Sequence, residues 1–130
     1  MKILYGVQGT GNGHITRSSI LIPILRDMGH KVEVIISGRN NTNFFDIDFL
    51  KAFEIKKGIT FITSKGEVKI FKTAFDLSPI EFIKDVRGRD LNNIDLVISD
   101  YEPITAWIAK LNNITSMGIA HQYAFKYNIP

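Results

Sequence analysis

The sequence predicts an α/β domain with a mainly parallel sheet, helices on both faces and a β-hairpin insertion. Residues 2–36 read as strand, glycine-rich loop, helix and strand, which is the order of a parallel βαβ unit. Strand and helix patterns alternate again over residues 96–120. At 130 residues the chain is long enough for one domain with its own hydrophobic core.

The first unit begins with an apolar run at residues 2–7, which predicts a buried parallel strand at the centre of the sheet. A helix should follow the glycines, with Gly29 as its C-terminal stop and a kink near Ser19 caused by Pro23. Residues 31–36 form the next predicted strand. The apolar spacing i, i+3, i+4, i+7 predicts that one helix face packs on the sheet, through Leu21, Ile24, Leu25 and Met28.

The middle of the chain carries weaker signals. Residues 44–57 show no pattern that favours one element. Residues 59–63 and 68–72 flank a polar turn containing Gly66, which predicts the hairpin. The order Ser78, Pro79 and Glu81 is typical of a helix start, and this helix should run to about residue 89 with Ile83 and Val86 facing inward.

The last third repeats the strand–helix pattern. Residues 96–99 predict a parallel strand that ends at Asp100, and Pro103 opens a helix. Residues 116–120 predict the final strand, which ends at His121. We expect the apolar positions of this helix, Trp107 included, to lie in the core: Ile104, Trp107, Ile108 and Leu111.

Composition narrows the function classes. The net charge of +3 comes from scattered Lys and Arg, so nucleic-acid binding is not favoured, although a mildly basic surface suits an anionic substrate or membrane face. The absence of Cys excludes disulfides and thiolate metal sites and is consistent with a cytoplasmic protein. No signal peptide or membrane-spanning run is visible, and no residue cluster has a metal-binding spacing.

Polar and titratable residues follow four predicted strands. In an open parallel sheet, ligands bind outside the carboxyl ends of the strands, where the strand order reverses. We therefore expect one crevice that His14, Asp100, Glu102 and His121 share, with Gln122 beside it.

The loop after the first strand is rich in glycine but fits neither the dinucleotide fingerprint nor the Walker A pattern. Its backbone N–H groups and the following helix N-terminus could hold an oxyanion. The alternative is a tight strand-to-helix turn with no ligand. The predicted ligand-binding residues of this loop are Gly9, Thr10, Gly11, Asn12 and Gly13.

Each charged candidate has two interpretations. His14 is a general base or a donor to a phosphate oxygen, or else only a capping residue. Arg17, one helical turn later, pairs with a phosphate or is a surface residue. Asp100 and Glu102 activate an acceptor hydroxyl or hold His14, or one of them caps the helix that Pro103 opens. His121 is a site residue or a histidine of the sheet rim.

Three segments resemble a known family of enzymes. Residues 5–17 (YGVQGTGNGHITR), residues 29–32 (GHKV) and residues 95–122, with the motif DLVISDYEP, are similar to the amino-terminal domain of two-Rossmann-domain (GT-B) glycosyltransferases. Within that class the chain looks like the group around the peptidoglycan N-acetylglucosaminyltransferase and its prokaryotic relatives. Two departures are visible: Asn12 stands where the peptidoglycan enzyme has Gly, and Thr115 where relatives often have Pro.

The resemblance implies a Rossmann-like fold and an inverting, metal-independent transfer from a nucleotide-activated sugar to an acceptor hydroxyl, with no cofactor. It implies that residues 1–130 are the acceptor-side domain of a longer enzyme, whose second domain holds most of the donor nucleotide. His14 would be the base, with Asp100 or Glu102 as its support or substitute. If the acceptor is a lipid, the enzyme would work at the membrane surface.

A binding module is the competing class. A free-standing Rossmann-like domain could hold a nucleotide or a phosphorylated ligand without catalysis, and the short length of the chain favours it. Under the half-enzyme interpretation, we expect the 130 residues alone to fold, to bind nucleoside diphosphates weakly and to catalyse nothing.

Overall fold

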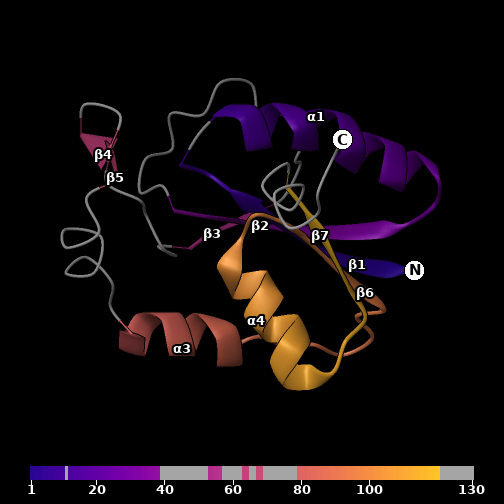
Figure 1. Cartoon of the computed structure of the whole chain (residues 1–130). Coiled ribbons are helices and arrows are strands. Elements are labelled where there is room, and N and C mark those ends of the chain that lie inside the picture. The colour runs from indigo at the N-terminus through magenta and orange to yellow at the C-terminus, as the bar shows by residue number, and fades with distance from the viewer. Residues whose placement is uncertain (11, 39–52, 57–62, 65–66, 69–78, 121–130) are drawn as a thin grey trace, which may run out of the picture.

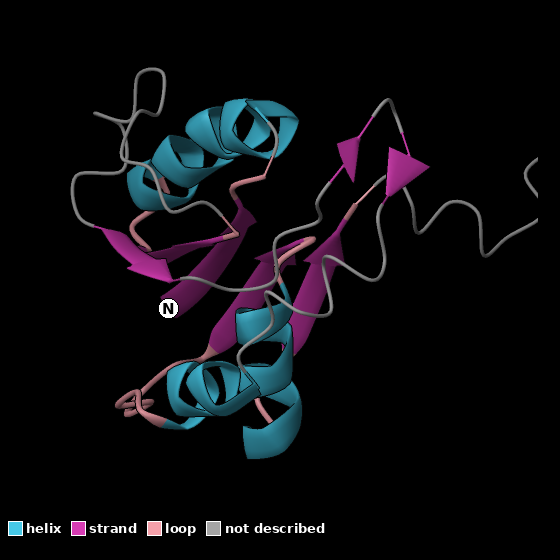
Figure 2. Cartoon of the chain, turned by 90° about the vertical axis from the view of Figure 1, so that its left-hand side faces the viewer, coloured by secondary structure: helices cyan, strands magenta, loops and turns pink. Residues whose placement is uncertain are grey.

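The structure is a computed structural model that describes residues 1–10, 12–38, 53–56, 63–64, 67–68 and 79–120. Five parallel strands form the main sheet, in the order β3-β2-β1-β6-β7. Helix α1 covers one face of this sheet, and α3 and α4 cover the other (Figures 1 and 2). The strands of the sheet are β1 (Lys2–Gln8), β2 (Lys31–Ser37), β3 (Phe53–Lys56), β6 (Leu96–Asp100) and β7 (Ser116–Ile119). The helices are α1 (Asn12–Asp27), α3 (Pro79–Arg87) and α4 (Pro103–Asn112).

The predicted fold class is confirmed, and β1 lies at the centre of the sheet as expected. It pairs with β2 on one side and β6 on the other, in parallel register. From β1 the chain builds β2 and β3 outward in one direction, then crosses to build β6 and β7 in the other. The strand order therefore reverses between β1 and β6, and a ligand crevice is expected at the carboxyl ends of these two strands.

Two hydrophobic layers hold the helices to the sheet, one on each face. Alternate residues of β1 enter opposite layers because side chains alternate across a strand. Tyr5 packs under α1, and Leu4 packs under α4. The layer under α1 consists of Ile3, Tyr5, Val7, Ile15, Ile22, Val32, Val34, Ile36 and Ile98. The layer under α3 and α4 consists of Leu4, Ile35, Val86, Ile94, Val97, Ile104, Ile108 and Ala109.

Helix α1 ends at Asp27, and Gly29 follows as the predicted stop, with a left-handed φ of 85°. The N–H of His30 bonds the Leu25 carbonyl, and the N–H of Gly29 bonds the Arg26 carbonyl. This pair of bonds is a Schellman motif, whose left-handed residue is usually glycine. Pro23 lies inside the helix, which stays one element.

The predicted inner face of α1 was partly wrong. Ile24 is 48% exposed and Met28 66%, whereas Ile15, Ser18 and Ile22 are buried. These buried positions follow the same helical period but start at Ile15. Residues 20–25 (ILIPIL) are apolar at every position, so the helical period fits more than one face of α1 and the sequence did not single out the buried face.

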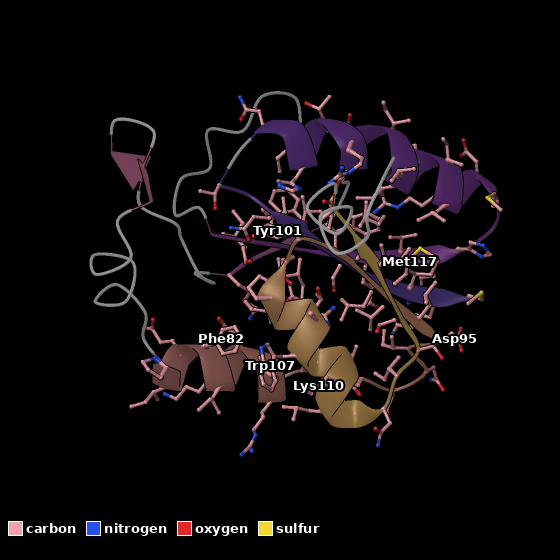
Figure 3. The ribbon with its side chains drawn as sticks, viewed as in Figure 1. Phe82, Asp95, Tyr101, Trp107, Lys110 and Met117 are labelled. Atoms are coloured by element: carbon pink, nitrogen blue, oxygen red, sulfur yellow. The ribbon has the colours of Figure 1, made fainter. Side chains whose placement is uncertain are left out.

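The predicted burial of three apolar side chains on α3 and α4 was also wrong. Ile83, Trp107 and Leu111 are about half exposed, although all three were expected to face inward. They line a groove between α3 and α4 together with Phe82 (Figure 3). Val86, Ile104 and Ile108 are buried as predicted.

The other differences concern element limits. Strand β3 lies within residues 44–57, where the sequence favoured no element. Helix α3 ends at Arg87, two residues early, and Ser78 lies outside the described residues. The hairpin is present as β4 (Thr63–Ser64) and β5 (Glu67–Val68), which pair in antiparallel register. Residues 59–62 and 69–72 of the two predicted strands, and Gly66 of the predicted turn, lie outside the described residues.

Candidate functional site

The site lies at the topological switch between β1 and β6. Val7 of β1 stands beside Asp100 of β6, so the loop that leaves β1 and the end of β6 meet at one edge of the sheet. Helix α1 starts there at Asn12. Its first turns carry His14 and Arg17, which are three residues apart and therefore project from the same side of the helix.

His14, Arg17 and Asp100 form one hydrogen-bonded cluster. Nδ1 of His14 lies 2.7 Å from Oδ1 of Asp100. Nε of Arg17 donates to Oδ2 of Asp100 at 2.9 Å, and Nη2 of Arg17 donates to Oδ1. The guanidinium thus holds both carboxylate oxygens, which is the strong, geometrically specific form of this ion pair.

The tautomer of His14 follows from these contacts. An ionised carboxylate only accepts hydrogen bonds, so we assign the proton to Nδ1, which donates it to Asp100. Nη2 of Arg17, 3.1 Å from Nδ1, is a donor and cannot bond to it in this tautomer. In a neutral ring, Nε2 is then the unprotonated nitrogen and can accept a proton.

Asp100 is fully buried, at 0% exposure, while the side chains of His14 and Arg17 are 15% and 32% exposed. A buried carboxylate needs compensation, and here Arg17 supplies a full positive charge. The hydrogen bond to Asp100 raises the pKa of Arg17 above its already high usual range. Tyr5 lies buried beneath the cluster, where desolvation raises the pKa of its hydroxyl.

Tyr101 joins the His14 cluster, although it was not among the residues predicted for the site. Its ring stacks on His14, with ring centroids 5.8 Å apart and planes only 8° from parallel. Its φ is 54°, in the left-handed region that bulky residues rarely adopt. Figure 3 shows Tyr101 beside the first turn of α4, on the side that faces α1. Such backbone strain is retained where the surrounding structure requires it, often at functional sites.

Glu102 belongs to a second buried cluster. It is the N-cap of α4, and its carboxylate accepts bonds from the N–H groups of Ile104 and Thr105 at 2.9 and 2.7 Å. The hydroxyls of Ser37 and Thr105 also donate to it, at 2.5 and 2.7 Å. At 1% exposure, desolvation raises the pKa of Glu102, although these bonds counteract the effect. The capping interpretation therefore accounts for this acid.

The two clusters lie on opposite faces of the sheet. Side chains two residues apart in a strand point to the same face of the sheet. Asp100 therefore shares the face of Ile98, which packs under α1, and Ser37 shares the face of Ile35, which packs under α4. The turn at Tyr101 separates the two acids. Asp100 thus contacts His14, and Glu102 contacts the end of β2.

The glycine loop is fastened to the end of β2. The N–H of Gly9 bonds the Ser37 carbonyl at 2.7 Å, and Nε2 of Gln8 donates to Oγ1 of Thr10 at 2.5 Å. Gly13, in the first turn of α1, has no described atom within 4 Å of where a Cβ would lie. Packing between described residues does not require a glycine there.

The predicted site was therefore partly wrong, because Glu102 lies in the second cluster, on the opposite face of the sheet from His14. His14 and Asp100 come together, and the loop residues Gly9, Thr10, Asn12 and Gly13 lead into the same helix. Gly11, His121 and Gln122 lie outside the described residues, so their site roles stay predictions. In the part of the chain that the structure describes, no group of three His, Asp or Glu side chains could hold a metal ion.

A family model described as glycosyl transferase family 1 matches residues 1–129. The chain belongs to this family. The β1 loop, His14 and the β6 end therefore lie in a family 1 glycosyltransferase domain, and the family's reaction is glycosyl transfer. No curated protein and no solved structure matches the chain significantly. Among the described helices, none combines the length and apolar character needed to cross a membrane.

Proposed function

We propose that this family 1 glycosyltransferase domain activates the acceptor hydroxyl in an inverting, metal-independent transfer from a nucleotide-activated sugar, with His14 as the general base. The 2.7 Å contact between Nδ1 of His14 and Oδ1 of Asp100 carries the proposal. It fixes the ring and supports the imidazolium that forms when Nε2 takes a proton. The matched family supports the reaction class.

The proposed step is a single displacement. Nε2 of His14 removes the acceptor hydroxyl proton while the acceptor oxygen forms a bond to the anomeric carbon. The bond from that carbon to the donor phosphate oxygen breaks, and the nucleoside diphosphate leaves with the electron pair. Asp100 stays ionised, so the charge that develops on the ring meets a fixed counter-charge at hydrogen-bond distance.

The glycine loop and the start of α1 suit the diphosphate. Backbone N–H groups at a helix N-terminus attract anions, and Gly13 leaves space for close approach. We propose that a second domain holds the nucleotide base and ribose, that the reaction needs no cofactor, and that the site is cytoplasmic. A lipid acceptor would bring the enzyme to the membrane surface.

The test is a transfer assay of the enzyme that includes its donor-binding half, with a panel of uridine, guanosine and thymidine diphosphate sugars. His14→Ala should lower kcat by about 10²–10⁴ and change KM little. An effect on KM alone would make His14 a binding residue. If the 130 residues alone bind a nucleoside diphosphate at micromolar affinity, the binding-module interpretation replaces the half-enzyme.

A further inference from the structure

We propose that Arg17 is a positioning residue whose fixed positive charge holds Asp100 in place and keeps the His14 ring free of a second proton. The inference rests on the proposed function for its catalytic meaning, because only an unprotonated Nε2 can act as the base. It changes the role expected of Arg17, which the sequence suggested as a phosphate ligand.

The guanidinium of Arg17 is hydrogen-bonded to the carboxylate of Asp100. Nε and Nη2 bond the two carboxylate oxygens, and Oγ of Ser18 adds a longer contact of 3.5 Å to Oδ2. With both oxygens held from α1, the carboxylate of Asp100 cannot rotate away from His14. The N–H groups that make this fork are therefore not available to a substrate phosphate.

The charge balance follows from the groups that face His14. Arg17 approaches from α1, Asp100 from β6, Tyr101 from the turn after β6, and Tyr5 lies beneath the cluster on β1. The tyrosines add no formal charge. Asp100 and Arg17 cancel, so the cluster is neutral when the His14 ring is neutral and carries +1 when the ring is protonated.

Removal of Arg17 would change this balance. Asp100 would remain buried with His14 as its nearest cationic partner, and an uncompensated buried carboxylate strongly favours a positive neighbour. The ring would then take up a proton at a higher pH than in the parent protein. At neutral pH a larger share of molecules would hold His14 in the imidazolium form, which cannot accept the acceptor proton.

The experiment follows the ring signals of His14 by NMR during a pH titration of the 130-residue chain. The three histidines are distinguished by the loss of one signal in His14→Ala. Arg17→Gln should move the midpoint of the His14 titration to higher pH by about one unit. Arg17→Lys keeps the charge and should move it less. Arg87→Gln, which removes an exposed positive charge from α3, should leave it unchanged.

A second comparison covers the case in which Arg17→Gln does not fold. The double variant Asp100→Asn/Arg17→Gln contains no buried charge at this position, and its midpoint should lie above that of Asp100→Asn alone. A midpoint that stays in place, or moves to lower pH, in a folded Arg17 variant would overturn the proposal and return Arg17 to the role of a phosphate ligand.

The outcome is separable from that of the proposed function because the titration uses no substrate. In the transfer assay, Arg17→Gln should move the acidic limb of the kcat profile to higher pH and recover activity as the pH rises. A merely structural residue would lower kcat at every pH. If the ring titration moves but His14→Ala transfers sugar normally, the charge relationship stands and the catalytic role of His14 fails.

Discussion

His14 and Asp100 are 86 residues apart in sequence, yet their side chains lie within 2.7 Å of each other at the reversal of strand order. The parallel pairing of β1 with β6 creates this contact, because it brings the carboxyl ends of the two strands to one edge. A histidine at the start of the helix that follows one strand thereby meets an acid at the end of the other. Neither residue indicates the other in the sequence.

The first prediction is that His14 and Asp100 act as one unit. Asp100→Asn should lower kcat by about 10²–10⁴, since an amide at this position can favour the wrong tautomer of the ring. The double variant with His14→Ala should be no worse than the more damaging single variant. Steady-state kinetics of the three variants check this, and additive losses would show that the residues act independently.

The second prediction concerns Glu102 and pH. Burial raises the pKa of Glu102 above its usual value of 4.5, so the folded state binds this proton more tightly than the unfolded chain. The contribution of Glu102 to the free energy of unfolding is therefore full below pH 4.5 and is lost as pH rises through the raised pKa.

Glu102→Gln removes this titration and places an amide nitrogen against donors. It should destabilise the domain by about 1–3 kcal/mol at low pH, and the difference from the parent should shrink as pH rises. Denaturant unfolding at several pH values measures it. Asp27→Asn, at an exposed position of α1, is the control and should change stability by less than about 0.5 kcal/mol. A difference that grows with pH would contradict the assignment.

Rules that depend on neighbouring residues in the sequence predicted the roles of Asp100 and Glu102 only in part. The N-cap rule applies to the residue just before a helix-opening proline, so Glu102 could be expected to cap α4. The left-handed turn at Tyr101 has no such signal, because it is imposed by the packing of Asp100 and Glu102 on opposite faces. The sequence likewise could not show that Arg17 pairs with Asp100, because the two residues are 83 positions apart and only the fold brings them together.

Periodicity predicted which elements exist better than it predicted their buried faces. Strands β1, β2 and β6 are short, mostly apolar runs, so their identity did not depend on choosing a face. Strand β3 is an edge strand with Glu54 and Lys56 in four residues, and it lacks that signal. Trp107 shows the converse, since an apolar side chain at helical spacing lies 44% exposed beside Lys110.

The third prediction concerns the strain at Tyr101. Tyr101→Gly should relieve a left-handed backbone by about 1 kcal/mol and remove the ring that stacks on His14. A ring contact of this kind contributes about 0.5–1.5 kcal/mol, so kcat should fall about 2- to 12-fold without loss of stability. Asn113→Gly, at the left-handed C-cap of α4, is the matched control and should leave kcat unchanged. Equal activity of parent and Tyr101→Gly would assign the ring to packing alone.

The fourth prediction concerns Gly6 in β1. A Cβ on Gly6 would lie 2.7 Å from Oε2 of Glu102 and closer still to Thr105, both of which are buried. Gly6→Ala should therefore destabilise the domain by about 1–3 kcal/mol, because α4 must shift away from the sheet. Thermal unfolding measures this. Gly6→Ala in a Thr105→Ser background should cost less, since Ser lacks the methyl group that also meets the new Cβ.

The fifth prediction uses Gly13 to test whether the glycine loop binds a ligand. Gly13 lies in the first turn of α1, and no described atom comes within 4 Å of the position of its missing Cβ. If the glycine has no ligand role, Gly13→Ala should only stabilise the domain, raising the free energy of unfolding by roughly 0.5–1 kcal/mol through helix propensity.

If the loop approaches a diphosphate closely, the methyl group of Gly13→Ala should obstruct it. We expect both effects together: a more stable domain, and a kcat/KM for the donor that is at least about tenfold lower, equivalent to 1.4 kcal/mol. Unfolding and transfer assays on the same preparations separate the two. A stabilised variant with unchanged kcat/KM would leave the loop as a tight turn and place the diphosphate elsewhere.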